Sequence, residues 1–243
     1  MTHYLAIITA YSAVAVLAWL AALLQPAFIP PAAARALDRR WLAAGQFALA
    51  ILAVVALRML HDRGWLLPET GVLSATFNQV LQYLPIIAYL AVQRSLAAAF
   101  VPAKGALPSL ATGVVLAVVA ALAYFSVRND WGELPHAVDA LFTTETVAPA
   151  LALGLQDLTI AALLALIADG WSRRTALVAA IAVFAVIHLP IMFADGVDMG
   201  GILAALANTA VVAGTVSAVL VTRNVLWFLP PHLVLALAPL TPS

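Results

Sequence analysis

The chain has 243 residues, of which 65% are hydrophobic and only 9% are charged, with 11 basic and 11 acidic side chains. About a quarter of the residues in a soluble domain are charged, so this composition excludes a soluble globule and indicates that lipid is most of the solvent. The balanced charge argues against nucleic-acid binding, which needs clustered Lys and Arg. The absence of cysteine excludes disulfides, thiolate metal sites and cysteine nucleophiles.

Eight apolar segments approach the length of about 20 residues that a helix needs to cross a bilayer. They lack the apolar–polar alternation of barrel strands, so we predict an all-α, polytopic transmembrane helix bundle of about eight spans. Short connections predict one domain over residues 1–243. In chain order the predicted spans are Tyr4–Phe28, Trp41–Leu60, Val72–Val92, Leu107–Val127, Val147–Ile167, Thr175–Phe193, Ile202–Val221 and Val225–Leu240.

The first four predicted spans, within residues 1–127, carry no recognisable motif. The longest connection follows them, at Arg128–Thr146, and its mixture of apolar and acidic residues fits either a short interfacial helix or a solvated loop. The eighth span is short and contains Pro230 and Pro231, so we expect it to be bent or preceded by a re-entrant turn.

The basic residues of the connections are divided unevenly between the two sides of the predicted bundle. Eight lie on one side and three on the other. Because Lys and Arg are enriched in cytoplasmic loops, this distribution predicts that both termini lie outside the cytoplasm. We expect the membrane to be a bacterial inner membrane.

Three ionisable residues fall inside predicted spans, namely Asp157, His188 and His232. At a rise of ~1.5 Å per residue, all three lie within about one helical turn of each other in depth. Intramembrane ionisable groups usually face the bundle interior and mark functional sites, so we predict a shared cavity. The amide residues placed in the same layer are Asn78, Gln79, Gln82, Gln156 and Asn208.

Such a layer has three possible roles: activation of a water molecule, binding of a metal ion, or hydrogen bonding between helices. A carboxylate beside an imidazole can activate a water molecule, and a second imidazole or an amide can stabilise an oxyanion. Two histidines and one short carboxylate are a thin ligand set for a metal, and the sequence has neither an HxxxH nor an HExxH pair, so we expect no metal and no cofactor. The third reading is interhelical hydrogen bonding alone.

The blocks of polar residues within 145–240 resemble the CAAX prenyl protease and bacteriocin-processing family of intramembrane proteases, also called CPBP or ABI proteins. That family carries Glu-Glu-x-x-x-Arg, Phe-x-x-x-His and His-x-x-x-Asn on separate transmembrane helices. Here Phe184 and His188 complete the second motif. The third motif retains His232 after a segment that begins at Asn224, but Ala236 replaces its asparagine.

The first motif departs furthest from the family pattern. Gln156 and Asp157 occupy the positions of the two glutamates, and Ala161 occupies that of the arginine. The resemblance implies that His188 acts with the first glutamate on the attacking water and that His232 stabilises the oxyanion. Gln156 matches the catalytic glutamate, but an amide cannot accept a proton at neutral pH. These changes favour a fold that has kept its cavity and lost the protease reaction.

The favoured hypothesis is therefore a degenerate relative of this family, a pseudoenzyme that acts as a scaffold or binding subunit of a membrane complex. Its partners are the lipid bilayer and a membrane protein that contacts the lipid-facing helices, with a peptide or a lipid-like molecule as a further ligand. Two alternatives stay open at the level of sequence. One is an active intramembrane endopeptidase that uses Asp157, His188 and His232, and the other is a small transporter or a subunit of an electron-transfer or pigment complex.

Overall fold

The computed structural model describes residues 2–25, 27–32, 39–68, 70–93, 101, 105–182 and 199–237. Within these ranges the regular structure is helical throughout, and no strand is present. The helices are α1 (Thr2–Leu24), α2 (Arg40–Asp62), α3 (Val72–Val92), α5 (Ala106–Arg128), α6 (Leu134–Leu141), α7 (Val147–Gly170), α9 (Met199–Thr222) and α10 (Leu229–Leu237). Residues 173–182 are also helical, and short 3-10 turns at Trp131–Glu133 and Thr144–Thr146 flank α6.

Five helices in the described part of the chain are long and apolar enough to cross a membrane. They are Leu5–Leu24, Arg40–Asp62, Val72–Val92, Ala106–Arg128 and Thr144–Gly170, and they coincide with the first five predicted spans. A backbone in lipid must satisfy its polar groups internally, so continuous helices of this length and composition identify a membrane-embedded helical protein.

The last three predicted spans are described in part, and the count of eight stays a prediction. The sixth begins as helix at residues 173–182 and then leaves the described residues. The seventh coincides with α9, which has 24 residues. The eighth opens with a turn at residues 226–228, and the helix that follows, α10, has nine residues. The expected bend near the paired prolines is therefore a turn that leads into a short helix.

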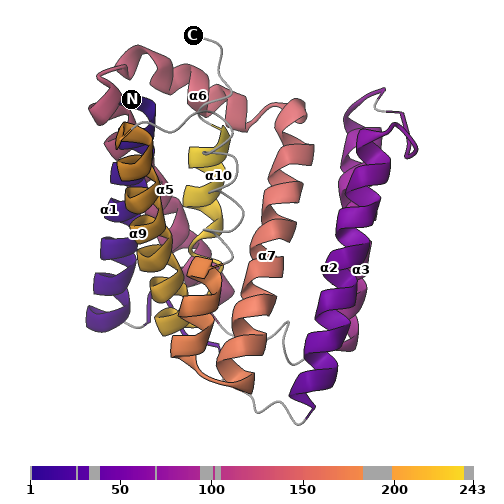
Figure 1. The fold of residues 1–243 in the computed structure, drawn as a ribbon. Coiled ribbons are helices and arrows are strands. Elements are labelled where there is room, and N and C mark those ends of the chain that lie inside the picture. The colour runs from indigo at the N-terminus through magenta and orange to yellow at the C-terminus, as the bar shows by residue number, and fades with distance from the viewer. Residues whose placement is uncertain are drawn as a thin grey trace.

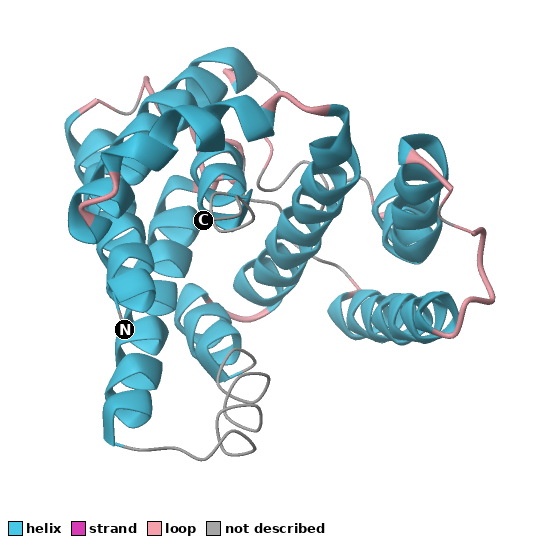
Figure 2. Ribbon diagram, turned by 90° about the horizontal axis from the view of Figure 1, so that it is seen from above, coloured by secondary structure: helices cyan, strands magenta, loops and turns pink. Residues whose placement is uncertain are grey.

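The helices form two groups on either side of α7 (Figure 1). On one side, α1 packs against α5 and α9, while α10 packs against α5. On the other side, α2 and α3 pair with each other, and α3 contacts α7. Seen from above, the α2–α3 pair lies at the edge of the molecule, joined to the rest through α7 (Figure 2).

Small residues determine how closely α1 approaches its neighbours. Ala6, Ala10, Val14 and Ala18 recur every four residues on one face of α1, and each is fully buried. Small side chains at this spacing let helix backbones pack closely in a membrane, where the hydrophobic effect contributes little between helices. The alanine-rich first span is therefore a packing surface, which holds α1 close to α5 and α9.

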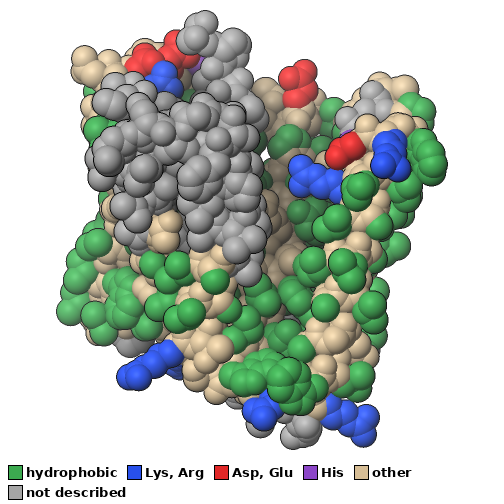
Figure 3. Space-filling view, in the orientation of Figure 1, with side chains coloured by type: hydrophobic (Ala, Val, Ile, Leu, Met, Phe, Trp, Pro, Cys, Tyr) green, Lys and Arg blue, Asp and Glu red, His purple; other side chains and the backbone are tan. Residues whose placement is uncertain are grey.

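The surface has the polarity expected of a protein in a bilayer. Hydrophobic side chains cover the sides of the molecule, acidic side chains lie toward the end that carries α6, and basic side chains lie at the opposite end, with a few more near the acidic end (Figure 3). The connection at Arg128–Thr146 contains α6, so of its two predicted forms the structure has the short helix.

Candidate functional site

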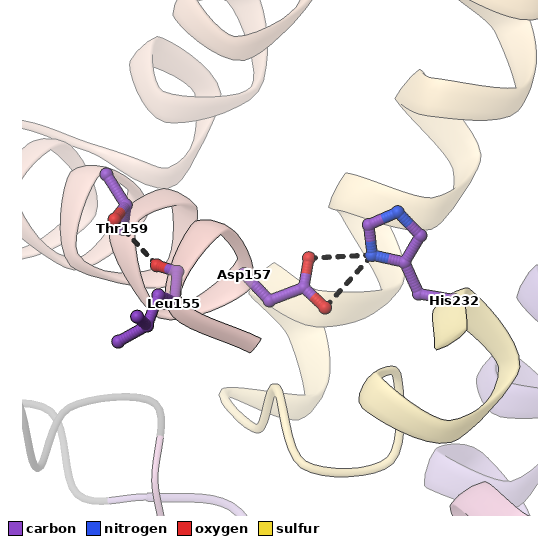
Figure 4. Close-up of polar contacts among 4 residues, drawn as sticks. All are labelled: Leu155, Asp157, Thr159 and His232. Carbon is purple, nitrogen blue, oxygen red and sulfur yellow. Dashed lines mark hydrogen bonds and ion pairs between the residues drawn. The ribbon is translucent and has the colours of Figure 1, made fainter. Parts of the chain in front are cut away.

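A buried carboxylate–imidazole pair joins α7 to α10. Nδ1 of His232 lies 2.8 Å from Oδ1 of Asp157 and 3.0 Å from Oδ2, and the two side chains point toward each other from facing helices (Figure 4). The side chain of Asp157 is 2% exposed and that of His232 is 17% exposed. The structure thus brings together two of the three ionisable residues predicted to share one depth.

The contact through Nδ1 assigns a role to each ring nitrogen of His232. A carboxylate in its ionised form only accepts hydrogen bonds, so with that form of Asp157 the hydrogen lies on Nδ1, which donates to it. The second nitrogen, Nε2, is then left either to accept a hydrogen bond from another group or, in the protonated ring, to donate one. Asp157 holds the imidazole in a single orientation, and Nε2 is the atom of the pair that can meet a water or a ligand.

Aromatic side chains surround the histidine. The imidazole stacks on Phe228, with ring centroids 5.1 Å apart and an interplanar angle of 27°, and the ring of Tyr11 lies 6.3 Å away. The phenols of Tyr11 and Tyr83 are both within electrostatic range of the Asp157 carboxylate. Phe228, in the turn before α10, and Tyr11, on α1, therefore lie beside the imidazole.

These aromatic neighbours were not predicted from the sequence. Phe228 precedes His232 by four residues, a spacing that places two side chains on the same side of a helical turn, so this neighbour could have been found. For Tyr11 and Tyr83 the sequence indicates only that each places a hydroxyl group inside an apolar segment. Nothing local indicates which helix either phenol faces.

A hydrogen-bonded turn sets the start of α10. Asn224 is fully buried, and its amide nitrogen donates to the carbonyl of Pro30 at 2.9 Å and to Oγ of Ser109 at 2.7 Å. Its Oδ1 accepts the backbone N–H of Leu226 at 2.9 Å. One side chain thus ties the turn to the segment after α1 and to the first turn of α5, which fixes the approach of the chain to His232.

A glycine on α5 lets the same turn approach closely. A Cβ added at Gly113 would lie 2.7 Å from the carbonyl oxygen of Trp227 and 2.9 Å from Pro230. Both distances are below those that real Cβ atoms show, so any larger residue would move α10 away from α5. The depth and rotation of His232 therefore depend on the absence of a side chain at position 113.

An ion pair anchors the other side of this turn. Arg223 donates to both carboxylate oxygens of Asp169, at the end of α7, with both nitrogen–oxygen distances 2.8 Å, and each side chain is 6% exposed. Arg223 has φ 48°, in the left-handed region, which non-glycine residues adopt only in a supportive context. The Asp157–His232 contact joins α7 to α10, and the Asp169–Arg223 contact joins α7 to the turn between α9 and α10. The helix α7 is thus held at two points along its length.

The remaining predicted site residues lie elsewhere. Gln156 is exposed, although it is adjacent to the buried Asp157, because successive helical residues are about 100° apart around the axis. His188, like Phe184 of the same motif, lies outside the described residues. Ala161 is 5% exposed and lies one turn beyond Asp157, and Ala236 is partly buried one turn beyond His232.

In the part of the chain that the structure describes, no hydrogen bond joins the predicted amides to the Asp157–His232 pair. Asn78 is buried, and its amide nitrogen donates to the carbonyl of Leu67 at 2.8 Å, so it holds the connection between α2 and α3. Gln82 is buried one turn further along α3, and Gln79 is partly buried. The side chain of Asn208 is not among those described.

Few of the described side chains near the Asp157–His232 pair could act as a nucleophile or hold a metal ion. Thr159 is the nearest hydroxyl-bearing neighbour of Asp157 on α7, and its Oγ1 donates to the carbonyl of Leu155 at 2.7 Å, away from His232 (Figure 4). Within the described residues, no group of three or more His, Asp or Glu side chains is placed to hold a metal ion. No family model, curated protein or solved structure matches the chain.

Proposed function

We propose that this protein is a non-catalytic relative of the CPBP intramembrane proteases that serves as a scaffold or binding subunit of a membrane complex. One observation carries the proposal. The carboxylate inside the bundle, Asp157, has both oxygens within 3.0 Å of the same nitrogen of His232, whereas Gln156, at the position of the catalytic glutamate, is exposed.

This arrangement supports a structural pair over a water-activating one. A general base must reach the proton that it removes, directly or through one water. Asp157 is 2% exposed and both of its oxygens lie within 3.0 Å of Nδ1 of His232, so its carboxylate is shielded from the surroundings. Gln156 is accessible but cannot take up a proton. A catalytic base must be both ionisable and accessible. Here Asp157 is ionisable but buried, and Gln156 is accessible but cannot take up a proton.

The exposed amide also supports contact with a partner helix. Gln156 lies ten residues into the apolar helix α7, where an amide that faces hydrocarbon leaves its donors and acceptor unsatisfied. Glutamine side chains in membranes commonly bond across helix–helix interfaces. A transmembrane helix of another protein, seated against this face of α7, would supply those hydrogen bonds.

Two experiments test the proposal. The purified protein in lipid nanodiscs is incubated with a quenched fluorescent library of membrane-associated peptides, and no cleavage above that of His232→Ala is expected. In cells, a photo-crosslinking amino acid at position 156 should give a discrete protein adduct, whereas the same group at Leu52, which is 65% exposed on α2, should give lipid adducts only. Cleavage that is lost in His232→Ala or His188→Ala contradicts the proposal.

The orientation is part of the same proposal. We infer that the protein lies in a bacterial inner membrane with both termini outside the cytoplasm, since basic residues in the connections favour the cytoplasmic side. The chain has no cysteine, so maleimide labelling of a single introduced cysteine shows on which side of the membrane that residue lies. An impermeant maleimide added to intact spheroplasts should label Asn129→Cys and spare Ser172→Cys, and the reverse result inverts the topology.

An active intramembrane endopeptidase that uses Asp157, His188 and His232 is the second candidate. It is supported by the orientation of the imidazole, because a carboxylate on Nδ1 leaves Nε2 to act as a general base, the division of roles found in histidine–carboxylate catalytic pairs. On this hypothesis Asp157→Asn abolishes peptide cleavage while Gln156→Ala retains it. Equal cleavage by Asp157→Asn and the parent protein would exclude it.

A further inference from the structure

Arginine and tryptophan side chains from two connections meet at the end of the molecule opposite α6. Arg40 donates to the carbonyl of Gly170 at 2.9 Å, and its guanidinium lies 5.5 Å from the ring centroid of Trp171. Trp41 contacts Trp171 edge to face, with ring centroids 5.1 Å apart. These contacts join the start of α2 to the turn after α7. We define the arginine–tryptophan patch as Arg39, Arg40, Trp41, Trp171, Arg173 and Arg174.

The patch is a concentration of accessible positive charge. All four arginines are exposed, and within the described residues Arg39, Arg173 and Arg174 form no ion pair. The nearest described carboxylate in the sequence, Asp169, is buried and bound by both of its oxygens to Arg223. Nothing acidic in the described part of this end offsets the four charges.

The placement of the arginines also costs the helices stability. Arg39 is the N-cap of α2 and Arg40 is its first residue, and Arg173 and Arg174 begin the helical segment 173–182. The amino-terminal end of a helix carries partial positive charge, which repels cations. A bound anion would offset both the repulsion among the arginines and their repulsion by the helix ends.

We propose that the arginine–tryptophan patch binds the phosphate headgroup of an anionic phospholipid. Arginine recognises phosphate through paired N–H donors, and clusters of basic residues directly beside transmembrane helices attract anionic lipids. This inference is independent of the proposed function, because it concerns the lipid-facing end of α2 and the turn after α7, not the Asp157–His232 pair.

The tryptophans favour a lipid over a free phosphate ion. Trp41 is 71% exposed and Trp171 is 38% exposed. Trp41 is the second residue of α2 and Trp171 directly follows the end of α7, and both helices are long enough to span a membrane. Tryptophan at such positions sits at the headgroup level of a bilayer. A phospholipid presents phosphate to the arginines and glycerol and acyl chains to the exposed parts of the indole rings, whereas inorganic phosphate would leave those exposed parts uncovered.

The experiment measures lipid binding by the full chain with native mass spectrometry. The protein is released from micelles that contain phosphatidylglycerol and phosphatidylcholine in equal amounts, and the ratio of the two binding constants is determined. The parent should prefer phosphatidylglycerol. Each basic residue near an anionic headgroup contributes about fivefold, so Arg173→Gln/Arg174→Gln should lower that preference by up to roughly 25-fold if both contact the headgroup.

A matched double variant at the other end of α2 provides the control. Arg58 and Arg63 are both exposed, and Arg63 is followed by Trp65, which is 71% exposed, so Arg58→Gln/Arg63→Gln removes the same charge near an equally exposed tryptophan. This variant should keep the preference. Far-UV circular dichroism compares the fold of the variants, and loss of the parent's preference at high salt provides evidence that does not depend on any variant.

Three results overturn the proposal. The first is a parent protein with no preference for phosphatidylglycerol. The second is an equal loss of preference in the two double variants, which would assign the effect to overall charge. The third is displacement of the lipid by inorganic phosphate in large molar excess, which would show that the patch binds a free anion without contribution from the acyl chains.

Discussion

Gln156 and Asp157 are adjacent in α7 and face opposite environments. The carboxylate is 2% exposed and bound to His232, and the amide is exposed. A helix turns about 100° per residue, so only one of two neighbouring residues can face a given helix. In the relationship to the CPBP proteases that we propose, the carboxylate that faces α10 is the one matched to the second glutamate, and the position of the first carries an amide.

The Asp157–His232 pair should contribute to stability through its burial. His232→Ala removes the partner of a carboxylate that is 2% exposed, and leaving such a charge unpaired should lower the free energy of unfolding by about 3 kcal/mol. Asp157→Asn keeps an acceptor for Nδ1 and should cost only about 1 kcal/mol. Unfolding in mixtures of mild detergent and sodium dodecyl sulfate, followed by tryptophan fluorescence, measures both.

The neighbouring residue supplies the control for this pair. Gln156→Ala alters an exposed side chain and should change the free energy of unfolding by less than about 0.5 kcal/mol. A result in which Gln156→Ala destabilises the protein as much as His232→Ala would mean that the amide, and not the carboxylate, faces the bundle.

The ion pair between Arg223 and Asp169 should behave as a coupled unit. Arg223→Met leaves Asp169 charged and 6% exposed, so we expect a loss of about 3–5 kcal/mol. The double variant Arg223→Met/Asp169→Leu removes both charges and should recover most of that loss, because a buried pair contributes little beyond an apolar replacement.

The same unfolding assay applies to this ion pair, with Arg63→Met as an exposed arginine control that should stay within about 0.5 kcal/mol of the parent. A double variant less stable than Arg223→Met would show that the two side chains act independently.

Asn224 should be more sensitive than an exposed amide at the same end of the bundle. Asn224→Ala removes a side chain that donates to Pro30 and Ser109 and accepts from Leu226, which leaves buried polar groups unsatisfied and should cost about 2–3 kcal/mol. Gln25→Ala changes an exposed amide and should be nearly neutral. Thermal midpoints in detergent, read by circular dichroism, compare the two variants.

The same argument predicts a local effect of Asn224→Ala on the turn. Amide hydrogen exchange of residues 225–228 should become faster in that variant, because Asn224 holds the backbone N–H of Leu226. Unchanged exchange there would show that the turn is fixed by other contacts.

Two glycines within membrane helices should respond in opposite ways to alanine. Gly113→Ala places a Cβ 2.7 Å from the carbonyl oxygen of Trp227, so α5 and α10 must separate, with an expected loss of about 1–3 kcal/mol. A Cβ at Gly154, in α7, meets nothing within 4 Å, so Gly154→Ala should stabilise the protein by about 0.5–1 kcal/mol through helix propensity. Unfolding free energies of equal sign would contradict this packing.

Much of the fold was predictable from the length and polarity of the apolar segments. The first five spans were located to within a few residues, because the thickness of the bilayer fixes how many apolar residues a helix needs and because lipid leaves the backbone no partner except itself. The mixture of apolar and acidic residues in the longest connection predicted either a short helix or a loop there. Only the structure showed that it is the helix α6.

For the candidate site, the sequence predicted only the depth of each residue in the membrane. A rise of ~1.5 Å per residue placed Asp157 and His232 at similar levels, and the structure brings them into contact. The sequence does not specify the rotation of a helix about its axis, which depends on how neighbouring side chains pack. The Arg223–Asp169 pair was missed for this reason. Arg223 lies in the connection between α9 and α10, and its guanidinium reaches inward to Asp169 at the end of α7.

By itself, the sequence determined that this protein lies in a membrane, that its framework is helical, and that Asp157 and His232 lie at similar depth within it. These properties follow from composition and segment length, which are local. Tertiary structure alone decided that His232 contacts Asp157, that Gln156 faces outward and that Arg223 lies inside. Each depends on helix rotation and on close approach, such as that of Gly113 to Trp227, and both are set by packing between segments distant in the chain.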